Sequence, residues 1–265
     1  MTIEIKLSGE QLALFDFIEN EHDHIFVTGR AGTGKSTLLN HFVNNTKKNV
    51  AVVAPTGVAA YNVGGQTIHS FFGFPFGVLG NQPIHKHLYG RTRDALRSLD
   101  VLVIDEISMV NSDLMDAMDT MLRAARGKNK GPFGGVQVVM FGDPYQLPPV
   151  PLKPSDEGYE FFKENYRSLW FFDAKVWSET KLLRYELHEN FRQHDDKFIE
   201  ILNAIRDGSV TQEMLDNLNQ AGNRYPENQD AIRLSGVNTK VNSYNANRLA
   251  NIPGETKFFE ANVSV

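Results

Sequence analysis

The sequence predicts an α/β fold in which helices cover both faces of a parallel β-sheet. Along residues 9–184, short apolar runs of strand length alternate with segments of helical periodicity, as expected for a sheet buried on both faces. The first apolar run leads into residues 29–36, Gly-Arg-Ala-Gly-Thr-Gly-Lys-Ser, which match the phosphate-loop pattern G-x-x-x-x-G-K-S/T. In such folds the ligand binds where the strands end.

The predicted elements follow in order along the chain. Ser8 is the expected N-cap of an opening helix over residues 9–20, with Gln11 just inside it. After the phosphate loop, apolar residues from Leu38 to Val43 recur at helical spacing. Buried strands are predicted at residues 25–27, 49–54, 101–104 and 136–141.

The sequence predicts a domain boundary near Arg184. Residues 1–184 form the first domain, and residues 185–265 form part of a second domain. In that second part, the segment through Gly208 and residues 231–249 have the pattern of helix, strand and helix. The five prolines within residues 144–154 lie among motif residues, which favours an ordered loop over a linker.

The composition restricts the classes of function. The 265 residues are 41% hydrophobic and 22% charged, with a net charge of −5, which excludes a uniformly basic nucleic-acid coat but permits a local cationic groove. There is no cysteine, which excludes disulfides and thiolate metal sites. Because no long apolar run and no signal peptide are evident, we expect a soluble intracellular protein with no membrane partner.

The phosphate loop predicts nucleoside triphosphate chemistry. Its glycines let backbone N–H groups face the β-phosphate, Lys35 adds positive charge at the β- and γ-oxygens, and Ser36 offers an oxygen to Mg²⁺. The competing interpretation is a glycine-rich turn with an exposed lysine. The candidate nucleotide-binding residues here are Gly32, Thr33, Gly34, Lys35, Ser36 and Thr37.

An acidic pair ends the third predicted strand. In Ile104-Asp105-Glu106, the first carboxylate is placed to hold Mg²⁺ and the second to act as general base toward an attacking water. Alone, such a pair is as often the N-cap of a helix, but its combination with a phosphate loop favours the catalytic interpretation.

The fourth predicted strand ends in Gly142-Asp-Pro-Tyr-Gln-Leu-Pro-Pro149. The prolines stop the strand at the ligand edge, so Gln146 is expected to face the γ-phosphate, where an amide can both donate and accept hydrogen bonds. The alternative is a rigid proline turn with a solvated glutamine.

Together, several segments resemble the ordered motifs of superfamily 1 DNA helicases, and those of the Pif family most closely. The segments are residues 29–36, 54–60, 67–73, 103–109, 132–135, 142–150 and 187–193. The resemblance covers nearly the whole chain and implies a RecA-like P-loop NTPase domain followed by a partial second RecA-like domain. It also implies an enzyme that uses ATP and Mg²⁺ to move 5′ to 3′ on single-stranded DNA and to unwind duplex or forked DNA, here expected as a monomer.

The resemblance also assigns residue roles. Gln11 matches the residue that reads the adenine edge, and Arg192 matches a second-domain arginine that reaches the γ-phosphate; without the family, Arg192 would be a helix-surface residue. The positions that match single-strand contacts are Thr56, Gly57, Val58, Thr67, His69 and Phe72. Phe71, Phe72, Phe74 and Phe76 are either a stacking face for bases or part of the core.

The family continues with an inserted domain and a final arginine motif, so the chain resembles the front of a longer enzyme. Without those later motifs, we expect this part to hydrolyse ATP weakly or not at all. Residues 233–249 resemble the next strand and helix, although Ser235-Gly236-Val237 departs from the usual form. Two other functions remain open: a nucleotide- or DNA-binding fragment without turnover, and a small-molecule phosphotransferase. The family's work on DNA implies a location in the cytoplasm of a bacterium, or in a nucleus or mitochondrion, and links with DNA repair, recombination and telomere maintenance.

Overall fold

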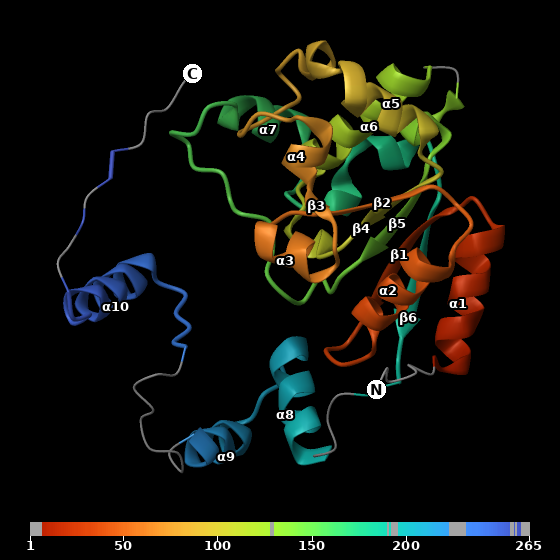
Figure 1. Ribbon diagram of the computed structural model, residues 1–265. Coiled ribbons are helices and arrows are strands. Elements are labelled where there is room, and N and C mark those ends of the chain that lie inside the picture. The colour runs from red at the N-terminus through yellow and green to blue at the C-terminus, as the bar shows by residue number, and fades with distance from the viewer. Residues whose placement is uncertain are drawn as a thin grey trace. The chain divides into compact units, whose positions relative to one another are not determined.

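A six-stranded parallel sheet forms the centre of the protein (Figure 1). The computed structural model describes residues 7–127, 130–189, 191, 196–222, 232–254, 257 and 259–260. The strand order is β3-β2-β4-β5-β1-β6, and every pairing is parallel. The strands are β1 (His24–Gly29), β2 (Val50–Ala54), β3 (Gln66–Thr67), β4 (Val101–Ile104), β5 (Gln137–Phe141) and β6 (Leu182–Leu187).

Helices cover both faces of this sheet, as the sequence predicts (Figure 1). Those described are α1 (Gly9–Asn20), α2 (Lys35–Asn45), α3 (Gly57–Asn62), α4 (Ile68–Phe72), α5 (Gly90–Ser98), α6 (Ser112–Arg126), α7 (Tyr159–Asn165), α8 (Asp196–Asp207), α9 (Gln212–Gly222) and α10 (Asn238–Ala250). Helices α1 and α2 pack on one face, and α4, α5 and α6 pack on the other. The α/β fold class is therefore confirmed.

Alternate side chains of the central strands point to opposite faces of the sheet and form two hydrophobic cores. Val101 and Val103 of β4 pack with α1 and α2, whereas Leu102 and Ile104 pack with the helices opposite. Because successive side chains of a strand point to opposite faces, a strand that is apolar throughout contributes to both cores. Strands β1, β4 and β5 are buried throughout for this reason, whereas Val50, Ala51 and Val52 of β2 are half-buried.

The opening helix begins where the sequence predicts. The Ser8 hydroxyl accepts a hydrogen bond from the Gln11 backbone N–H at 3.3 Å, and the Gln11 side chain accepts one from the Ser8 N–H at 3.0 Å. This capping box satisfies two N–H groups that have no partner within the helix. It also fixes Gln11 on the side of α1 that faces the phosphate loop, where its side chain is 3% exposed.

The structure divides the chain later than the sequence suggests. The predicted boundary at residue 184 falls inside β6, which pairs with β1 from His24↔Leu182 to Gly29↔Leu187. The chain separates instead into residues 1–210 and residues 211–265, so α8 belongs to the first unit. Hydrogen bonding of an edge strand to the sheet outweighs the change in sequence character near Arg184.

The second unit contains α9 and α10. The predicted helix is found at α10, but residues 232–237 form no strand in the part of this unit that the structure describes. A strand requires a neighbour for its backbone N–H and C=O groups, and the described residues of this unit offer none. No helix in the described ranges is long and apolar enough to span a bilayer.

His24 makes the stability of the fold depend on pH. Its Nδ1 accepts a hydrogen bond from the Val138 N–H at 3.0 Å, and its ring packs against Phe133 and Trp177. Burial lowers the pKa of His24 from 6.5 to about 4, although the nearby Asp23 opposes the shift. Between these values the unfolded chain binds the extra proton and the folded chain does not, so stability falls as the pH decreases through this window.

We expect that lowering the pH from 7 to 4 costs about 3 kcal/mol of stability through His24. In His24→Asn, whose side-chain oxygen can accept the Val138 N–H, this part of the pH dependence should disappear. Urea unfolding of wild type and variant at several pH values measures the difference. The same replacement at the exposed His22 is the control, and equal slopes for wild type and His24→Asn would contradict the assignment.

Candidate functional site

Three neighbouring strands bring the predicted nucleotide residues to one edge of the sheet. Strand β5 lies between β1 and β4, so the ends of all three strands meet. A cavity of ≈ 180 Å³ opens at this edge. It is lined by Ala31, Gly32, Thr33, Gly34, Lys35, Ser36, Thr37, Asp105, Glu106, Gly142 and Gln146. The phosphate loop, the acidic pair and the predicted γ-phosphate residue therefore share one pocket.

The glycines of the phosphate loop are required by its geometry. A Cβ at Gly29 would lie 2.7 Å from the Leu187 carbonyl oxygen, and a Cβ at Gly34 would lie 2.3 Å from Nε2 of Gln11. Gly34 has a φ of 77° and is the N-cap of α2, and no side chain caps this helix. The first N–H groups of α2 therefore face the pocket, where the helix dipole favours an anion such as phosphate.

Lys35 is held at the mouth of this loop. Its Nζ donates to the carbonyl oxygens of Gly29 at 2.7 Å and Arg30 at 3.1 Å. Burial lowers the pKa of Lys35, while the carboxylates of Asp143 and Glu106 oppose that shift. A partly desolvated ammonium next to uncapped N–H groups suits a polyphosphate, because charge interactions strengthen where water is excluded.

The two residues of the acidic pair, Asp105 and Glu106, differ in burial and in backbone conformation. Asp105 is 9% exposed, and burial raises its pKa to about 6; a hydrogen bond from the Glu106 backbone opposes this shift, and the Glu106 carboxylate adds to it. Glu106 is half-buried and has a left-handed backbone, with φ 51° and ψ 44°. This conformation costs a non-glycine residue about 1–2 kcal/mol. The left-handed conformation of Glu106 turns the chain at the end of β4, and both acidic residues line the pocket.

The residues present fit a Mg²⁺ ion held together with a nucleotide. Ser36 and Asp105 supply a hydroxyl and a carboxylate oxygen, the ligand types that Mg²⁺ prefers. No cluster of three or more His, Cys, Asp or Glu side chains suitable for a metal occurs among the described residues.

Of the two residues whose nucleotide roles come from the resemblance, Gln11 lies beside the phosphate loop. The Gln11 side chain donates to the carbonyl oxygens of Thr33 and Gly34, each at 3.4 Å, so it contacts the phosphate loop. Arg192 lies outside the described residues. Its neighbour Phe191 donates its N–H to the Gly32 carbonyl at 2.9 Å, which joins this segment to the loop.

A second cavity adjoins the first. It measures ≈ 260 Å³ and is lined by Thr56, Val58, Ala59, Asn62, Glu106, Met109, Gln146 and Leu147. Glu106 and Gln146 line both cavities. The first predicted DNA segment and the predicted γ-phosphate residue are therefore neighbours.

Strand pairing brings the two predicted DNA segments together. Strands β2 and β3 pair at Ala54↔Thr67, immediately before Thr56 and within the second segment. Both threonines cap short helices: Thr56 Oγ1 accepts from the Ala59 N–H, and Thr67 Oγ1 accepts from the Ser70 N–H, each at 3.2 Å. Gly57, the first residue of α3, is exposed. These hydroxyls order the helix starts whatever else they contact.

The Phe72 side chain lies in the core, one of the two alternatives that the sequence left open for the phenylalanines of this segment. Phe72 is 0% exposed and stacks on the buried Phe74 within the core, because the apolar side of α4 must pack against the sheet. Phe76 is instead 89% exposed, and its ring stacks on His69 with centroids 5.3 Å apart. Burial lowers the pKa of His69, which favours the neutral imidazole.

The sequence analysis missed one contact at this edge. Asp143 is 1% exposed and forms an ion pair with Arg206 of α8, with Nε and Oδ2 3.0 Å apart. The two residues are 63 positions apart, so no local spacing relates them. A buried aspartate directly after an apolar strand is the one signal that could have indicated a partner.

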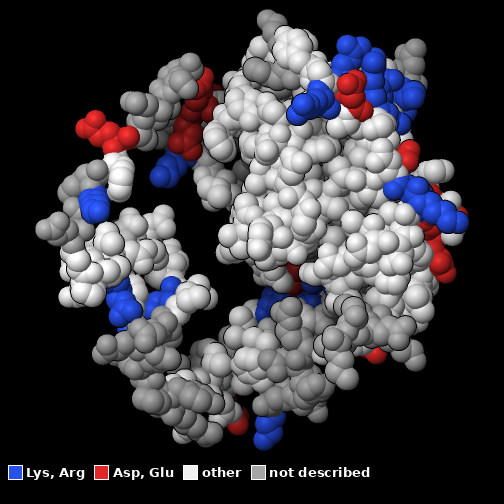
Figure 2. Space-filling view, viewed as in Figure 1, with Lys and Arg blue, Asp and Glu red and all other residues white. Residues whose placement is uncertain are grey.

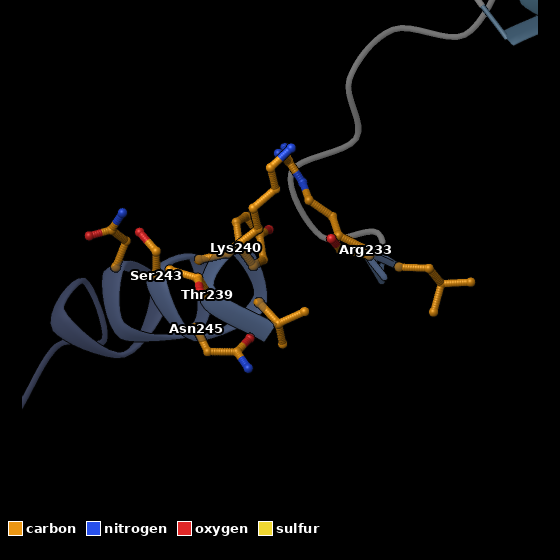
Figure 3. A pocket seen from close by; sticks show the side chains of 10 residues that line it. Arg233, Thr239, Lys240, Ser243 and Asn245 are labelled. Carbon is orange, nitrogen blue, oxygen red and sulfur yellow. The ribbon is translucent and has the colours of Figure 1, made fainter. Parts of the chain in front are cut away.

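A separate pocket lies in the second unit. It has a volume of ≈ 760 Å³ and includes Arg233, Lys240 and Tyr244 among its lining residues. The Arg233 guanidinium lies over the Tyr244 ring at 4.7 Å. Figure 3 shows the Arg233 and Lys240 side chains extending to the same side of α10. No functional residue was predicted here, and the described contacts assign none.

Comparison with known proteins decides the family. A model described as PIF1-like helicase matches residues 6–216. The chain belongs to the PIF1-like helicase family. It is 38% identical to the ATP-dependent DNA helicase PIF1 of Saccharomyces cerevisiae over 98% of this chain and 30% of that protein, and 37% identical to the PIF1 helicase of Xenopus laevis over 98% of this chain and 40% of that protein.

Solved PIF1 structures share the fold. A Bacteroides Pif1 helicase in complex with ADP-AlF3 and single-stranded DNA has a TM-score of 0.84 at 37% identity, covering 95% of this chain and 59% of that one. A structure of two coordinating Pif1 helicases at forked double-stranded DNA has a TM-score of 0.85 at 38% identity, covering 96% and 59%. The RecA-like fold is thus confirmed. This chain spans less than two thirds of the length of each of these relatives.

Removing the Lys35 ammonium should weaken nucleotide binding. In Lys35→Ala we expect the affinity for a labelled ATP analogue to fall about 10- to 100-fold, the range for losing a hydrogen bond to a charged group. Fluorescence titration measures the change, and Lys47→Ala, at an exposed lysine outside the pocket, is the control. Unchanged affinity in Lys35→Ala would remove Lys35 from the site.

Proposed function

We propose that this chain provides the ATP-hydrolysing and single-strand-binding part of an ATP-dependent DNA helicase that moves 5′ to 3′. The observation that carries the proposal is the shared wall of the two cavities, because Glu106 and Gln146 line both the phosphate-loop pocket and the pocket beside Thr56. Loss of the γ-phosphate can thus change the positions of residues that also line the proposed DNA surface, with no intervening residues needed. The polarity rests on the family alone.

Each residue of the phosphate-loop pocket has a distinct chemical task in this proposal. The N–H groups at the start of α2 and the Lys35 ammonium bind and orient the phosphates. Ser36 and Asp105 would hold Mg²⁺, which neutralises charge on the β- and γ-phosphates when bound. Glu106 accepts the proton of the attacking water, and Gln146 contacts the γ-phosphate. Gln11 reads the adenine edge, and Arg192 reaches the γ-phosphate.

Single-stranded DNA is the proposed partner at the surface formed by α3, α4 and the Phe76 segment. None of the residues in 56–62 or 67–76 is Lys or Arg, so phosphates there would be held by backbone N–H groups and hydroxyls. The exposed Phe76 ring offers a stacking face to a base of any sequence.

Duplex or forked DNA is the proposed substrate for unwinding. We propose that the chain is a monomer that acts on DNA inside the cell.

The second candidate is a fragment that binds nucleotide or DNA without turnover. Phosphate release by this chain, measured with and without a single-stranded oligonucleotide, separates the two. DNA-stimulated release supports the helicase function, whereas binding of both ligands without release supports the second candidate. Release that ignores DNA would instead favour a small-molecule phosphotransferase.

Glu106→Gln should separate binding from hydrolysis. The variant keeps Asp105 for the metal but loses the base, so we expect unchanged affinity for ATP and Mg²⁺ and a fall in phosphate release of about 100-fold or more. Glu164→Gln, at an exposed helix position, is the matched control. A loss of ATP affinity equal to that of Lys35→Ala would contradict this division of roles.

Phe76 should contribute to DNA binding. In Phe76→Ala we expect about a tenfold lower affinity for a single-stranded oligonucleotide, the effect of losing one stacked base. Fluorescence anisotropy measures this, and wild-type affinity should fall as salt rises because phosphates take part. Phe172→Ala, at a half-exposed aromatic residue outside the cavity, is the control. Equal losses in both variants, or binding confined to one sequence, would count against the proposed surface.

A further inference from the structure

The end of α8 is fixed to the loop that follows β5 by a two-pronged ion pair. Arg206 donates from Nε to Asp143 Oδ2 at 3.0 Å and from Nη2 to Asp143 Oδ1 at 3.1 Å. The Arg206 side chain is 15% exposed and the Asp143 side chain 2% exposed. A bidentate pair of this kind fixes orientation as well as distance, because the guanidinium and the carboxylate are both planar. Figure 2 shows basic and acidic side chains close together near the middle of this view.

The same carboxylate organises the turn that carries Gln146. Oδ1 of Asp143 accepts the Tyr145 N–H at 3.1 Å, and the Asp143 carbonyl accepts the Gln146 N–H at 3.0 Å. The Arg206 guanidinium also lies over the Tyr145 ring, 4.3 Å from its centroid. Arg206 therefore contacts two residues of a four-residue turn whose last member lines both cavities.

The helix end itself is well defined. The Ser209 N–H donates to the Ala204 carbonyl at 2.8 Å, and Gly208 has a φ of 71°, so the helix ends in a left-handed residue. The next residue after Arg206, Asp207, makes a weaker link to Arg30 of the phosphate loop at 3.6 Å, with both side chains more than 40% exposed. Exposed pairs contribute little, so the Asp143 contact is the stronger attachment.

Arg206 also lies within the electrostatic field of the phosphate pocket. Its guanidinium contributes to the lowered pKa of Lys35, while Asp143 opposes that effect. Negative charge added at the phosphate positions would therefore act on both members of the ion pair. Asp143 is buried, and leaving it without its partner would be strongly unfavourable. The turn and the helix end are thus expected to move as one body.

We propose that Arg206 is a positioning residue that couples the Gln146 turn to α8. Contact of a γ-phosphate with Gln146 shifts the turn, the ion pair carries that shift to the end of α8, and the chain that follows the helix receives it. Conversely, the attachment to α8 holds Gln146 where it can discriminate a triphosphate from a diphosphate. This inference rests on the proposed function, because it assumes that the pocket binds ATP.

The test compares nucleotide preference with the stability of α8 in the 265-residue chain. Affinities for a non-hydrolysable ATP analogue and for ADP are measured by titration, and hydrogen exchange of α8 is followed without nucleotide. In Arg206→Ala we expect the preference for the triphosphate over ADP to fall about tenfold, a coupling typical of residues in one hydrogen-bonded network, with ADP affinity unchanged. Exchange of residues in α8 should increase.

Three further variants isolate the cause. Arg206→Lys keeps the charge but cannot form two parallel bonds, so it should restore only part of the preference. Asp143→Asn is close in size to the native residue and should match Arg206→Ala, and the double variant should be no worse than either single one. Glu200→Gln, at an exposed position of α8, is the control and should leave both measurements unchanged.

Two results would overturn the coupling. If the Arg206 and Asp143 variants speed exchange of α8 but keep the full triphosphate preference, the pair is structural only. If α8 exchanges as in wild type, no attachment exists, whatever the nucleotides do. Failure of the wild-type chain to bind either nucleotide would instead overturn the proposed function, and this inference with it, a result recognised from the unmodified protein alone.

Discussion

The parallel placement of β5 between β1 and β4 is the constraint on which the site depends. Parallel neighbours bring their carboxyl ends to one edge, and the connections between them must cross the faces of the sheet as helices. That arrangement leaves the loops at the carboxyl edge free for chemistry. The phosphate loop, the acidic pair and the Gln146 turn meet because three strands share a direction and lie next to one another.

Charge is concentrated at this edge in a way that does not serve stability. Lys35, Asp105, Asp143 and Arg206 are wholly or partly desolvated within one small region. Removing such groups from water costs several kcal/mol each, and pairing repays that cost only in part. The strained backbone of Glu106 adds to the cost. The two hydrophobic cores on either side of the sheet provide the stability that allows the edge to be arranged for binding.

The sequence predicts best where local pattern and sheet geometry act together. The phosphate loop, Asp105 and Gln146 could be assigned because each follows an apolar run, and parallel strands must bring such ends together. The sequence could not decide between the two alternatives for Phe72, because a phenylalanine on a short amphipathic helix has the same local pattern whether it faces the core or the solvent. The contact between Asp143 and Arg206 depends on the path of the chain through β6 and α8, which no spacing encodes.

The edge strand β6 contains the predicted domain boundary. Its residues alternate between apolar and polar, and most are half-buried, so the segment lacks the continuous apolar run of the inner strands. Such a strand is easily taken for the start of another region. In the structure it is bonded to β1 over its whole length, directly beside the phosphate loop.

This position of β6 has a consequence for dissecting the protein into smaller pieces. The Leu187 carbonyl lies against Gly29, and the backbone of Phe191 is bonded to Gly32, so the stretch after β6 forms one wall of the phosphate loop. A recombinant piece that stopped at residue 184 would keep the phosphate loop, the acidic pair and the Gln146 turn in its sequence, yet leave the loop without that wall and β1 without half of its neighbour. A piece meant to fold with an intact nucleotide pocket should therefore extend past the end of α8, so that it includes Arg206.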